Sequence, residues 1–98
     1  MPLDIERLPQ ANDDLIELYW YIVDRSPAGA SSTMRQIDDA VRILAENPEA
    51  GRLRSELRDN LRSFPAGNYN LFYSVGTVLT VVRVLSAARD VTAEFFAD

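Results

Sequence analysis

Histidine, cysteine and lysine are all absent from this chain of 98 residues. The absence of cysteine excludes disulfides and thiolate metal sites, and the absence of histidine removes the commonest metal ligand and the commonest general base. Any catalysis would therefore depend on arginine, tyrosine, aspartate or glutamate. No apolar run approaches the length of a bilayer-spanning helix, and residues 1–6 lack a basic region followed by an apolar stretch. We expect no signal peptide, no membrane association, no metal or other cofactor, and a cytoplasmic location.

Charge is divided unevenly along the chain, which carries a net charge of −5. Residues 1–50 hold four arginines and ten acids, whereas residues 51–98 hold six arginines and five acids. Affinity for nucleic acid depends heavily on neutralising phosphates, so direct nucleic-acid binding is not expected. With 47% hydrophobic residues, the chain can bury one core, and we expect a single domain over residues 1–98.

The first half of the chain predicts a short strand and two amphipathic helices. Alternation of apolar and charged residues favours a strand over about 3–8, and Pro9 then suits the first turn of a helix over about 9–25. Ser26 followed by Pro27 is typical of a helix start, and this second helix should end near Asn47. The apolar positions step by three and four residues: Ala11, Leu15, Leu18, Tyr19 and Ile22, then Ala30, Met34, Ile37, Val41 and Leu44. The short connection predicts an antiparallel helical hairpin.

The second half changes to an alternating period. Gly51 should supply a flexible turn, and strands are predicted over Leu57–Phe64, Tyr69–Val75 and Val78–Leu85. Gly76-Thr77 has the composition of a two-residue hairpin turn with glycine first. The last strand is apolar on both faces, so it should lie inside the sheet, covered by helices on one side and by another element on the other.

Thr92 to Phe96 favours a short C-terminal helix, with Asp90 as its N-cap and Arg89-Asp90 as a local ion pair. The predicted fold class is therefore α+β. It consists of an N-terminal strand, an antiparallel helical hairpin, a three-stranded antiparallel sheet and a short C-terminal helix.

Six short segments then form a series. They are A-N-D-D-L-I-E-L-Y-W-Y-I at 11–22, L-A-E-N-P-E-A-G-R at 44–52, L-R-S at 61–63, Y-N-L-F-Y at 69–73, V-R-V-L at 82–85 and R-D at 89–90. Each is weak alone, but in this order they resemble the small toxins of the RelE/ParE superfamily, on the ParE side. The resemblance covers nearly the whole chain and implies the same fold.

The resemblance also implies a function. Members are toxins of type II toxin–antitoxin pairs: RelE-like toxins are ribosome-dependent ribonucleases that cleave messenger RNA, whereas ParE-like toxins are reported to poison DNA gyrase. The ribonuclease branch uses Lys, Arg, His, Glu and a Tyr or His near the C-terminus. Here Ser86 stands where many relatives carry His, and Phe95-Phe96 provide no hydroxyl.

The proton-transfer set thus looks incomplete, and we predict no catalytic residues. The resemblance implies a non-catalytic toxin that inhibits DNA gyrase and is neutralised by a cognate antitoxin. An RelE-like messenger RNA endonuclease and an inert interaction module, a decayed toxin, remain alternatives.

Arginines are the main candidates for contacts. Arg52, Arg54 and Arg58 form a predicted stripe that could receive the acids of an antitoxin segment, or could be a solvated face or pair with the acidic helices. Arg62, in an otherwise apolar strand, is a candidate target contact together with Arg83 and Arg89. For Arg83 a structural ion pair is favoured over a target contact, because charges are rarely buried unpaired.

Aromatic residues supply the other candidates. Tyr19-Trp20-Tyr21 cannot all be buried on one helix, so Trp20 is a candidate antitoxin contact. Phe95 and Phe96 predict either a cover for the core or an anchor for the antitoxin. Tyr69 and Tyr73 share a strand face with Leu71, a pattern more typical of a core than of chemistry.

Overall fold

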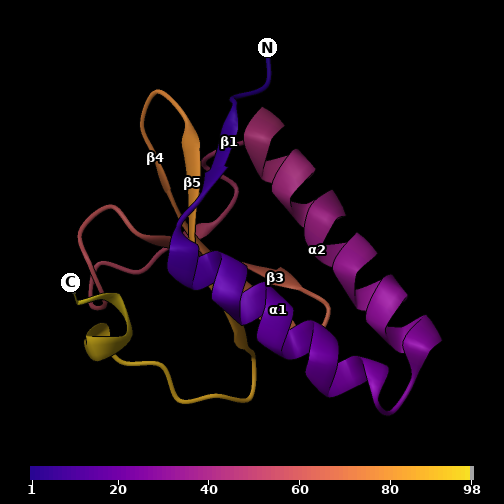
Figure 1. Cartoon of the computed structure of the whole chain (residues 1–98). Helices are drawn as coiled ribbons and strands as arrows, with labels where there is room; N and C mark the ends of the chain where they lie inside the picture. The colour runs from indigo at the N-terminus through magenta and orange to yellow at the C-terminus, as the bar shows by residue number, and fades with distance from the viewer. Residues whose placement is uncertain (98) are drawn as a thin grey trace.

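Two helices pack on one face of a five-stranded sheet in the computed structural model, which describes residues 1–97 (Figure 1). The elements are β1 Ile5–Arg7, α1 Pro9–Val23, α2 Pro27–Glu46, β2 Arg52–Leu53, β3 Arg62–Ala66, β4 Tyr69–Val75, β5 Leu79–Ser86 and the 3₁₀ helix η1 Ala93–Phe96. The predicted α+β fold class is confirmed. None of the helices in the described part of the chain combines the length and the apolar character needed to cross a membrane.

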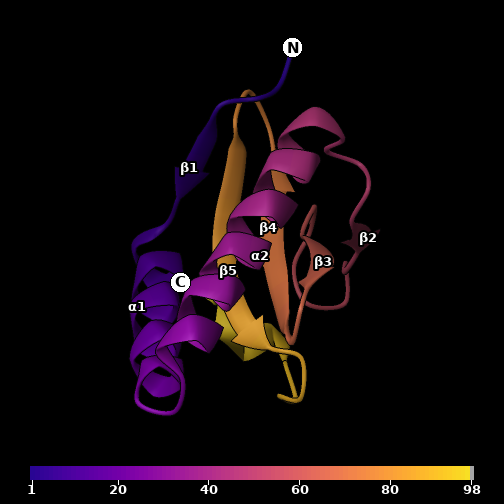
Figure 2. The same cartoon turned by 90° about the vertical axis from the view of Figure 1, so that its right-hand side faces the viewer.

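Both helices begin where the prolines indicated. Pro9 and Pro27 occupy the first turns of α1 and α2, where the missing N–H costs no hydrogen bond. The hydroxyl of Ser26 accepts a hydrogen bond from the backbone N–H of Gly29 at 3.0 Å, as expected of an N-cap. The short connection makes α1 and α2 a hairpin, and both lie on the same side of the sheet (Figures 1 and 2).

The sheet is larger than the three strands predicted. Its order is β1-β5-β4-β3-β2, with β3, β4 and β5 antiparallel as expected. The helical hairpin acts as a crossover, so β1 pairs parallel to β5, with Ile5 opposite Leu79. A two-residue strand, β2, adds to the other edge, with Arg52 opposite Ser63.

The strand predicted over Leu57–Phe64 is wrong at both ends, because β3 spans Arg62–Ala66. Residues 54–61 instead fold into turns, with the Leu57 N–H bonded to the Arg54 carbonyl and Asn60 at φ 62°. This path buries Leu57 and the following Leu61 under the sheet. Proline is tolerated at position 65 because β2 pairs only with the first two residues of β3, leaving that edge open.

The hairpin turn predicted at Gly76-Thr77 is also wrong. Val75 pairs with Leu79, which leaves a three-residue loop, and Gly76 is not among the residues with positive φ. The two-residue loop lies instead between Ala66 and Tyr69, where Gly67 has φ 60°. Glycine is suited to that position because it adopts left-handed backbone without strain.

β5 is an interior strand with a hydrophobic cluster on each face, as predicted. The helix-side cluster includes Leu71 and Tyr73 of β4, which confirms the core role expected for Tyr73. The opposite cluster is closed by the C-terminal segment, which lies across the sheet from the helices (Figure 1). Its buried members are Leu57, Leu61, Phe72, Val82, Leu85 and Phe96.

A β-bulge changes which residues of β5 face each cluster. Phe72 pairs with Arg83 but Tyr73 pairs with Val81, so Val82 is an extra residue in β5. The bulge shifts the alternation by one position, and Val81 and Val84 both join the helix-side cluster.

Candidate interaction surfaces

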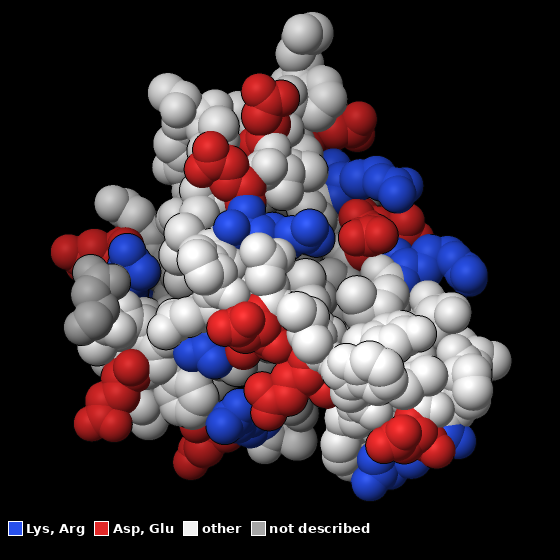
Figure 3. All heavy atoms as spheres, in the orientation of Figure 1, with Lys and Arg blue, Asp and Glu red and all other residues white. Residues whose placement is uncertain are grey.

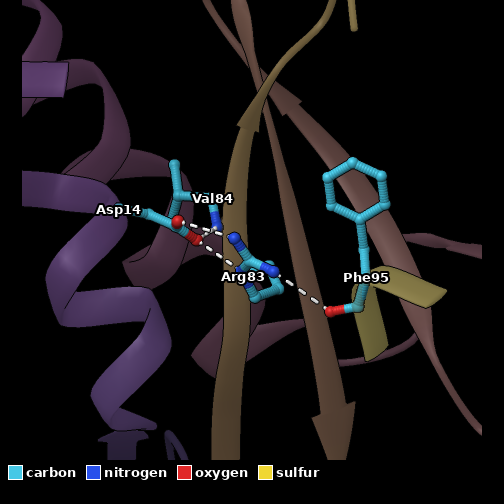
Figure 4. A network of polar contacts seen from close by, with 4 residues as sticks. All are labelled: Asp14, Arg83, Val84 and Phe95. Carbon is cyan, nitrogen blue, oxygen red and sulfur yellow. Dashed lines mark hydrogen bonds and ion pairs between the residues drawn. The ribbon is translucent and has the colours of Figure 1, made fainter. Parts of the chain in front are cut away.

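Arg83 joins three parts of the chain in one polar network (Figure 4). Its Nε donates to Oδ2 of Asp14 at 2.8 Å and its Nη2 to Oδ1 at 2.9 Å. Its Nη1 donates to the carbonyl oxygen of Phe95 at 3.1 Å, so one guanidinium links α1, β5 and η1. The structural ion pair favoured from sequence for Arg83 is confirmed.

Asp14 also closes an open sheet edge. β1 ends at Arg7, and its last link to β5 is the hydrogen bond from the Leu8 N–H to the Val81 carbonyl. Beyond that point the N–H of Val84 has no strand neighbour, and it donates to Oδ2 of Asp14 at 3.0 Å. A buried N–H without a partner is costly, so the aspartate takes the place of the missing strand.

Sequence reasoning missed Asp14, although a signal was present. The residue lies three positions after Ala11 and four before Leu18, which places it on the apolar stripe of α1, and it is only 8% exposed. A carboxylate on such a stripe needs a cation, and the apolar strand β5 carries one. The hydrogen bonds with Asp14 raise the pKa of Arg83 above its ordinary value, against the opposing effect of burial.

Arg62 and Tyr73 hold the junction between α2 and the sheet. Nη1 of Arg62 donates to the carbonyl oxygens of Gly51 at 2.7 Å and Glu49 at 3.3 Å. The Tyr73 hydroxyl donates to the Pro48 carbonyl at 2.7 Å and accepts from the Gly51 N–H at 2.9 Å. Arg62, predicted as a target contact, therefore has one of its three guanidinium nitrogens bonded to two main-chain carbonyls.

Gly51 serves this junction by its lack of a side chain rather than by a flexible turn. Gly51 is not among the residues with positive φ, so any residue could adopt its backbone conformation. A Cβ there would lie 2.3 Å from the Tyr73 hydroxyl oxygen, which is closer than atoms can approach. The glycine is required because the Pro48 carbonyl and the Gly51 N–H hold the tyrosine hydroxyl where a Cβ at position 51 would lie.

Tyr73 gives a testable dependence of stability on pH. Its pKa is raised above the usual 10.0, chiefly because burial disfavours the phenolate, although the Gly51 hydrogen bond and Arg62 act in the opposite direction. The folded state therefore holds this proton more tightly than the unfolded state. The protonated Tyr73 hydroxyl contributes its full stabilisation of the fold below a pH of about 10. This contribution is lost as the pH rises through the pKa of Tyr73 in the folded state.

We expect the free energy of unfolding, measured by urea titration, to fall steadily as the pH is raised from about 9 to about 12. The chain has no histidine, cysteine or lysine, so tyrosines dominate side-chain titration there. Tyr73→Phe should flatten this fall, whereas Tyr21→Phe, at a side chain that is 60% exposed, should leave it unchanged. An equally steep fall in Tyr73→Phe would contradict the assignment.

The predicted arginine stripe is partly used within the chain. Arg54 donates to Glu56 at 2.9 Å and to Ser63 at 3.2 Å, and its guanidinium lies over the Phe72 ring. Its acidic partner is thus in the same loop rather than on the helices. Arg52 and Arg58 are exposed, and within residues 1–97 neither forms a side-chain hydrogen bond or an ion pair.

The C-terminal candidates divide into one buried and two accessible residues. Phe96 is 6% exposed and packs on Phe72 with ring centroids 5.1 Å apart, so it covers the core. Phe95 is half-buried, and exposed Arg89 lies over its ring at 5.0 Å. The cap and ion pair expected of Asp90 are wrong, because Thr92 is at the N-cap of η1 and Arg89 has no ion pair with a described residue.

The outer side of α1 carries an exposed apolar patch. Ile16, Tyr19 and Trp20 are 58%, 36% and 62% exposed, and Tyr19 and Trp20 contact each other edge to face. Figure 3 shows a broad white area on the helical face of the molecule, with charged groups above, beside and below it. We call Ile16, Tyr19 and Trp20 the α1 patch; it lies on the opposite side of the sheet from Arg54 and Phe96.

A groove runs from β1, between the helices, to the α1 patch. A hollow of about 540 Å³ is walled by β1 and both helices, and a second of about 340 Å³ reaches Trp20. Four residues line both hollows, which makes them one trough: Arg7, Asn12, Leu15 and Met34. We call this trough the interhelical groove.

Comparisons with known proteins identify relatives of this chain in sequence and in fold. The family model described as ParE toxin of type II toxin–antitoxin system, parDE, matches residues 5–91. Toxin ParE1 of Mycobacterium tuberculosis is 37% identical over 87 residues, covering 85% of this chain and 88% of the relative. Toxin ParE1 of Caulobacter vibrioides is 27% identical over 85 residues, covering 86% and 88%.

Solved structures show the same fold at lower identity. The chromosomal ParDE toxin–antitoxin system from P. aeruginosa matches with a TM-score of 0.71 at 19% identity, covering 86% of this chain and 95% of that one. The toxin–antitoxin complex RelBE2 from Mycobacterium tuberculosis matches with a TM-score of 0.62 at 22% identity, covering 88% and 99%. With the family model spanning most of its length, this chain belongs to the ParE toxins of type II toxin–antitoxin systems.

Proposed function

We propose that this ParE-type toxin acts without catalysis, by binding DNA gyrase and stalling its cleaved DNA complex, and that a cognate antitoxin neutralises it. The observation that carries the non-catalytic mechanism is the state of its arginines. Arg83 is held by Asp14, and Arg62 is held by the carbonyls of Gly51 and Glu49. All three nitrogens of Arg83 and one nitrogen of Arg62 are thus bonded within the fold, which makes these guanidinium groups less available to stabilise a phosphate in an RNA-cleaving site.

The chain also offers few side chains that could act as the general base and general acid of RNA cleavage. Cleavage of RNA at a 2′-hydroxyl needs a base for that proton and an acid for the leaving oxygen. The chain has no histidine or lysine, and the hydroxyl of Tyr73 is buried and bonded to backbone groups. Among the three candidate target contacts, Arg89 is the one that is exposed, and it remains our candidate for the gyrase contact.

An antitoxin partner is supported by the apolar surface on the helices. Trp20 and Ile16 are more than half exposed, which is costly unless a partner covers them. Two of the similar solved structures are a ParDE system and a RelBE2 complex, each a toxin–antitoxin pair. We therefore place the antitoxin on the α1 patch and in the interhelical groove, with Arg52, Arg58 and Phe95 as further contacts where a longer antitoxin segment wraps the toxin.

The experiment has two arms. We expect the purified toxin to inhibit supercoiling by gyrase and to increase the amount of cleaved DNA, while leaving messenger RNA intact in a translating extract. Arg89→Glu should weaken inhibition roughly tenfold if that charge meets the target, whereas Arg35→Glu, an exposed arginine on α2, should change it little. Messenger RNA cleavage without gyrase inhibition would overturn the proposal in favour of an endonuclease.

A cellular test separates a toxin from an inert module. Expression of the chain alone should arrest growth and induce the DNA damage response, and co-expression of the protein from the adjacent reading frame should restore growth. Normal growth under expression that yields folded protein would indicate a decayed toxin.

A further inference from the structure

Another hollow lies between the second half of α1 and the end of β5, apart from the interhelical groove. It has a volume of about 350 Å³, and we call it the β5-end hollow. Among the described residues, Val84 is the only one that lines both the groove and this hollow. The other lining residues include Glu17, Leu18 and Tyr21 of α1, Leu85 and Ser86 of β5, and Arg89.

The end of β5 presents an unused backbone donor to this hollow. The Ala87 N–H donates to the Asn68 carbonyl at 2.9 Å, on the β4 side of the strand. The Val84 N–H donates to Asp14, on the opposite side (Figure 4). Because neighbouring residues of a strand direct their N–H groups to opposite sides, Ser86 directs its N–H away from β4, as Val84 does. Within residues 1–97 this N–H has no hydrogen-bond acceptor.

The fold itself shows which chemical group binds a donor of this kind. Two residues earlier on the same edge, the Val84 N–H is bonded to a carboxylate oxygen of Asp14 at 3.0 Å. The Ser86 N–H is an equivalent donor beyond the reach of that carboxylate. A second carboxylate, brought by a partner, would satisfy it in the same way.

Arg89 adds an oriented cation to the same hollow. Its guanidinium carbon lies 5.0 Å from the centre of the Phe95 ring, and the Phe95 carbonyl accepts a hydrogen bond from Arg83 at 3.1 Å. This stacking restricts the arginine side chain before any partner arrives. In the part of the chain that the structure describes, Arg89 forms no ion pair, so its charge is available to a partner's carboxylate.

We propose that the β5-end hollow binds a carboxylate on an extended segment of gyrase, which the Ser86 N–H and the Arg89 guanidinium hold together. This inference rests on the proposed inhibition of gyrase and names the group that the target must present. Apolar neighbours of the carboxylate pack against Leu18 and Tyr21, whose ring is 60% exposed. An extended backbone suits the site because it continues the edge of β5 beyond the end of β1.

Glu17 is the acid that works against such a ligand. The charge of Asp14 is offset by its two hydrogen bonds with Arg83. The pKa of Arg83 is raised chiefly by those bonds and further by the charge of Glu17, so this exposed glutamate lies near the same network. Glu17 and Arg89 are therefore the opposing charges that a partner meets in the hollow. Removing Glu17 should make the hollow more attractive to a carboxylate.

The first test separates the backbone N–H of Ser86 from its side chain, with supercoiling by purified gyrase as the assay. Ser86→Ala and Ser86→Pro both remove the hydroxyl that accepts from the Ala88 N–H at 3.2 Å, but only proline also removes the backbone donor. We expect Ser86→Ala to inhibit within about twofold of wild type and Ser86→Pro to require an about tenfold higher concentration. Combined with Arg89→Gln, Ser86→Pro should lose less than the product of the single effects, since one carboxylate meets both groups.

A gain of inhibition supplies the second test, because a misfolded variant cannot produce it. Glu17→Gln removes the opposing acid and should lower the half-inhibitory concentration of the toxin about threefold at low salt. Asp13→Asn is the matched control, since it removes an equal charge from an exposed position of α1 that does not line the hollow. Circular dichroism of each variant verifies that the fold is retained, and if Ser86→Pro does not fold, the comparison of Glu17→Gln with Asp13→Asn decides.

The results distinguish failure of this inference from failure of the proposed function. If wild-type toxin inhibits gyrase but folded Ser86→Pro equals Ser86→Ala, or Glu17→Gln equals Asp13→Asn, the inference is overturned and the proposed function stands. If Ser86→Pro still inhibits gyrase but loses affinity for the protein from the adjacent reading frame, the hollow belongs to the antitoxin and the inference is likewise overturned. If wild-type toxin does not inhibit gyrase, the proposed function fails and this inference fails with it.

Discussion

Replacing Asp14 with alanine is expected to lower the free energy of unfolding by about 3–5 kcal/mol, the usual cost of removing one partner from a buried ion pair. Three hydrogen bonds disappear together, from Nε and Nη2 of Arg83 and from the Val84 N–H. The Arg83 side chain is only 16% exposed, so its charge would be left poorly solvated inside the protein. Urea denaturation at neutral pH measures the loss.

Asp13→Ala is the matched control, because its neighbouring carboxylate is exposed and its change should stay within about 0.5 kcal/mol. Asp14→Asn should have an intermediate effect, since an amide keeps the shape and one acceptor but loses the charge. The effects of Asp14→Ala and Arg83→Met should not add, because the two residues form one interaction. A loss below about 1 kcal/mol in Asp14→Ala would show that water or another group replaces the carboxylate.

Gly51→Ala should be nearly as damaging, although it adds only a methyl group. The new Cβ would lie 2.3 Å from the Tyr73 hydroxyl oxygen and 2.6 Å from a ring carbon, so the buried ring must move. Overpacking of this kind costs about 1–3 kcal/mol, and loss of the hydrogen bonds to Pro48 and Gly51 adds to it. We expect a clear drop in the thermal midpoint, measured by circular dichroism.

Gly76→Ala provides the comparison, because no atom lies within 4 Å of a Cβ at that position in the β4–β5 loop. It should change stability by less than about 0.5 kcal/mol. Combining Gly51→Ala with Tyr73→Phe should cost less than the sum of the two single changes, since removing the hydroxyl relieves part of the clash. Equal stability of Gly51→Ala and Gly76→Ala would mean that the junction tolerates a side chain.

Local signals were sufficient for much of the fold. Pro9, Ser26 and Pro27 marked helix starts because caps act within one turn, and alternation of apolar residues gave the bounds of β4 as Tyr69–Val75. The apolar residues on both faces of β5 correctly implied that other elements cover the strand on both sides of the sheet. The candidate arginines could be named, but whether each is free depends on which groups the fold brings beside it.

The errors arose where distant segments determine the outcome. The alternating pattern of Leu57–Phe64 describes a strand equally well as a turn that buries two leucines, and the pairing of β3 with β4 decides between them. Val82 as a bulge residue has no mark in the sequence, because the irregularity exists only relative to β4. Asp14 had a local signal in its place on the apolar stripe of α1, but its partners Arg83 and Val84 can be identified only once a helix from the beginning of the chain and a strand from its end are adjacent.

That adjacency has a consequence for synthesis. β1 pairs with residues 79–81, and Asp14 bonds to positions 83 and 84, so the first elements made find their partners among the last. Contacts of such sequence separation cannot form on the ribosome until nearly the whole polypeptide has emerged. The sheet therefore lacks its parallel edge strand, and Asp14 its partners, until β5 has been synthesised and has left the ribosome.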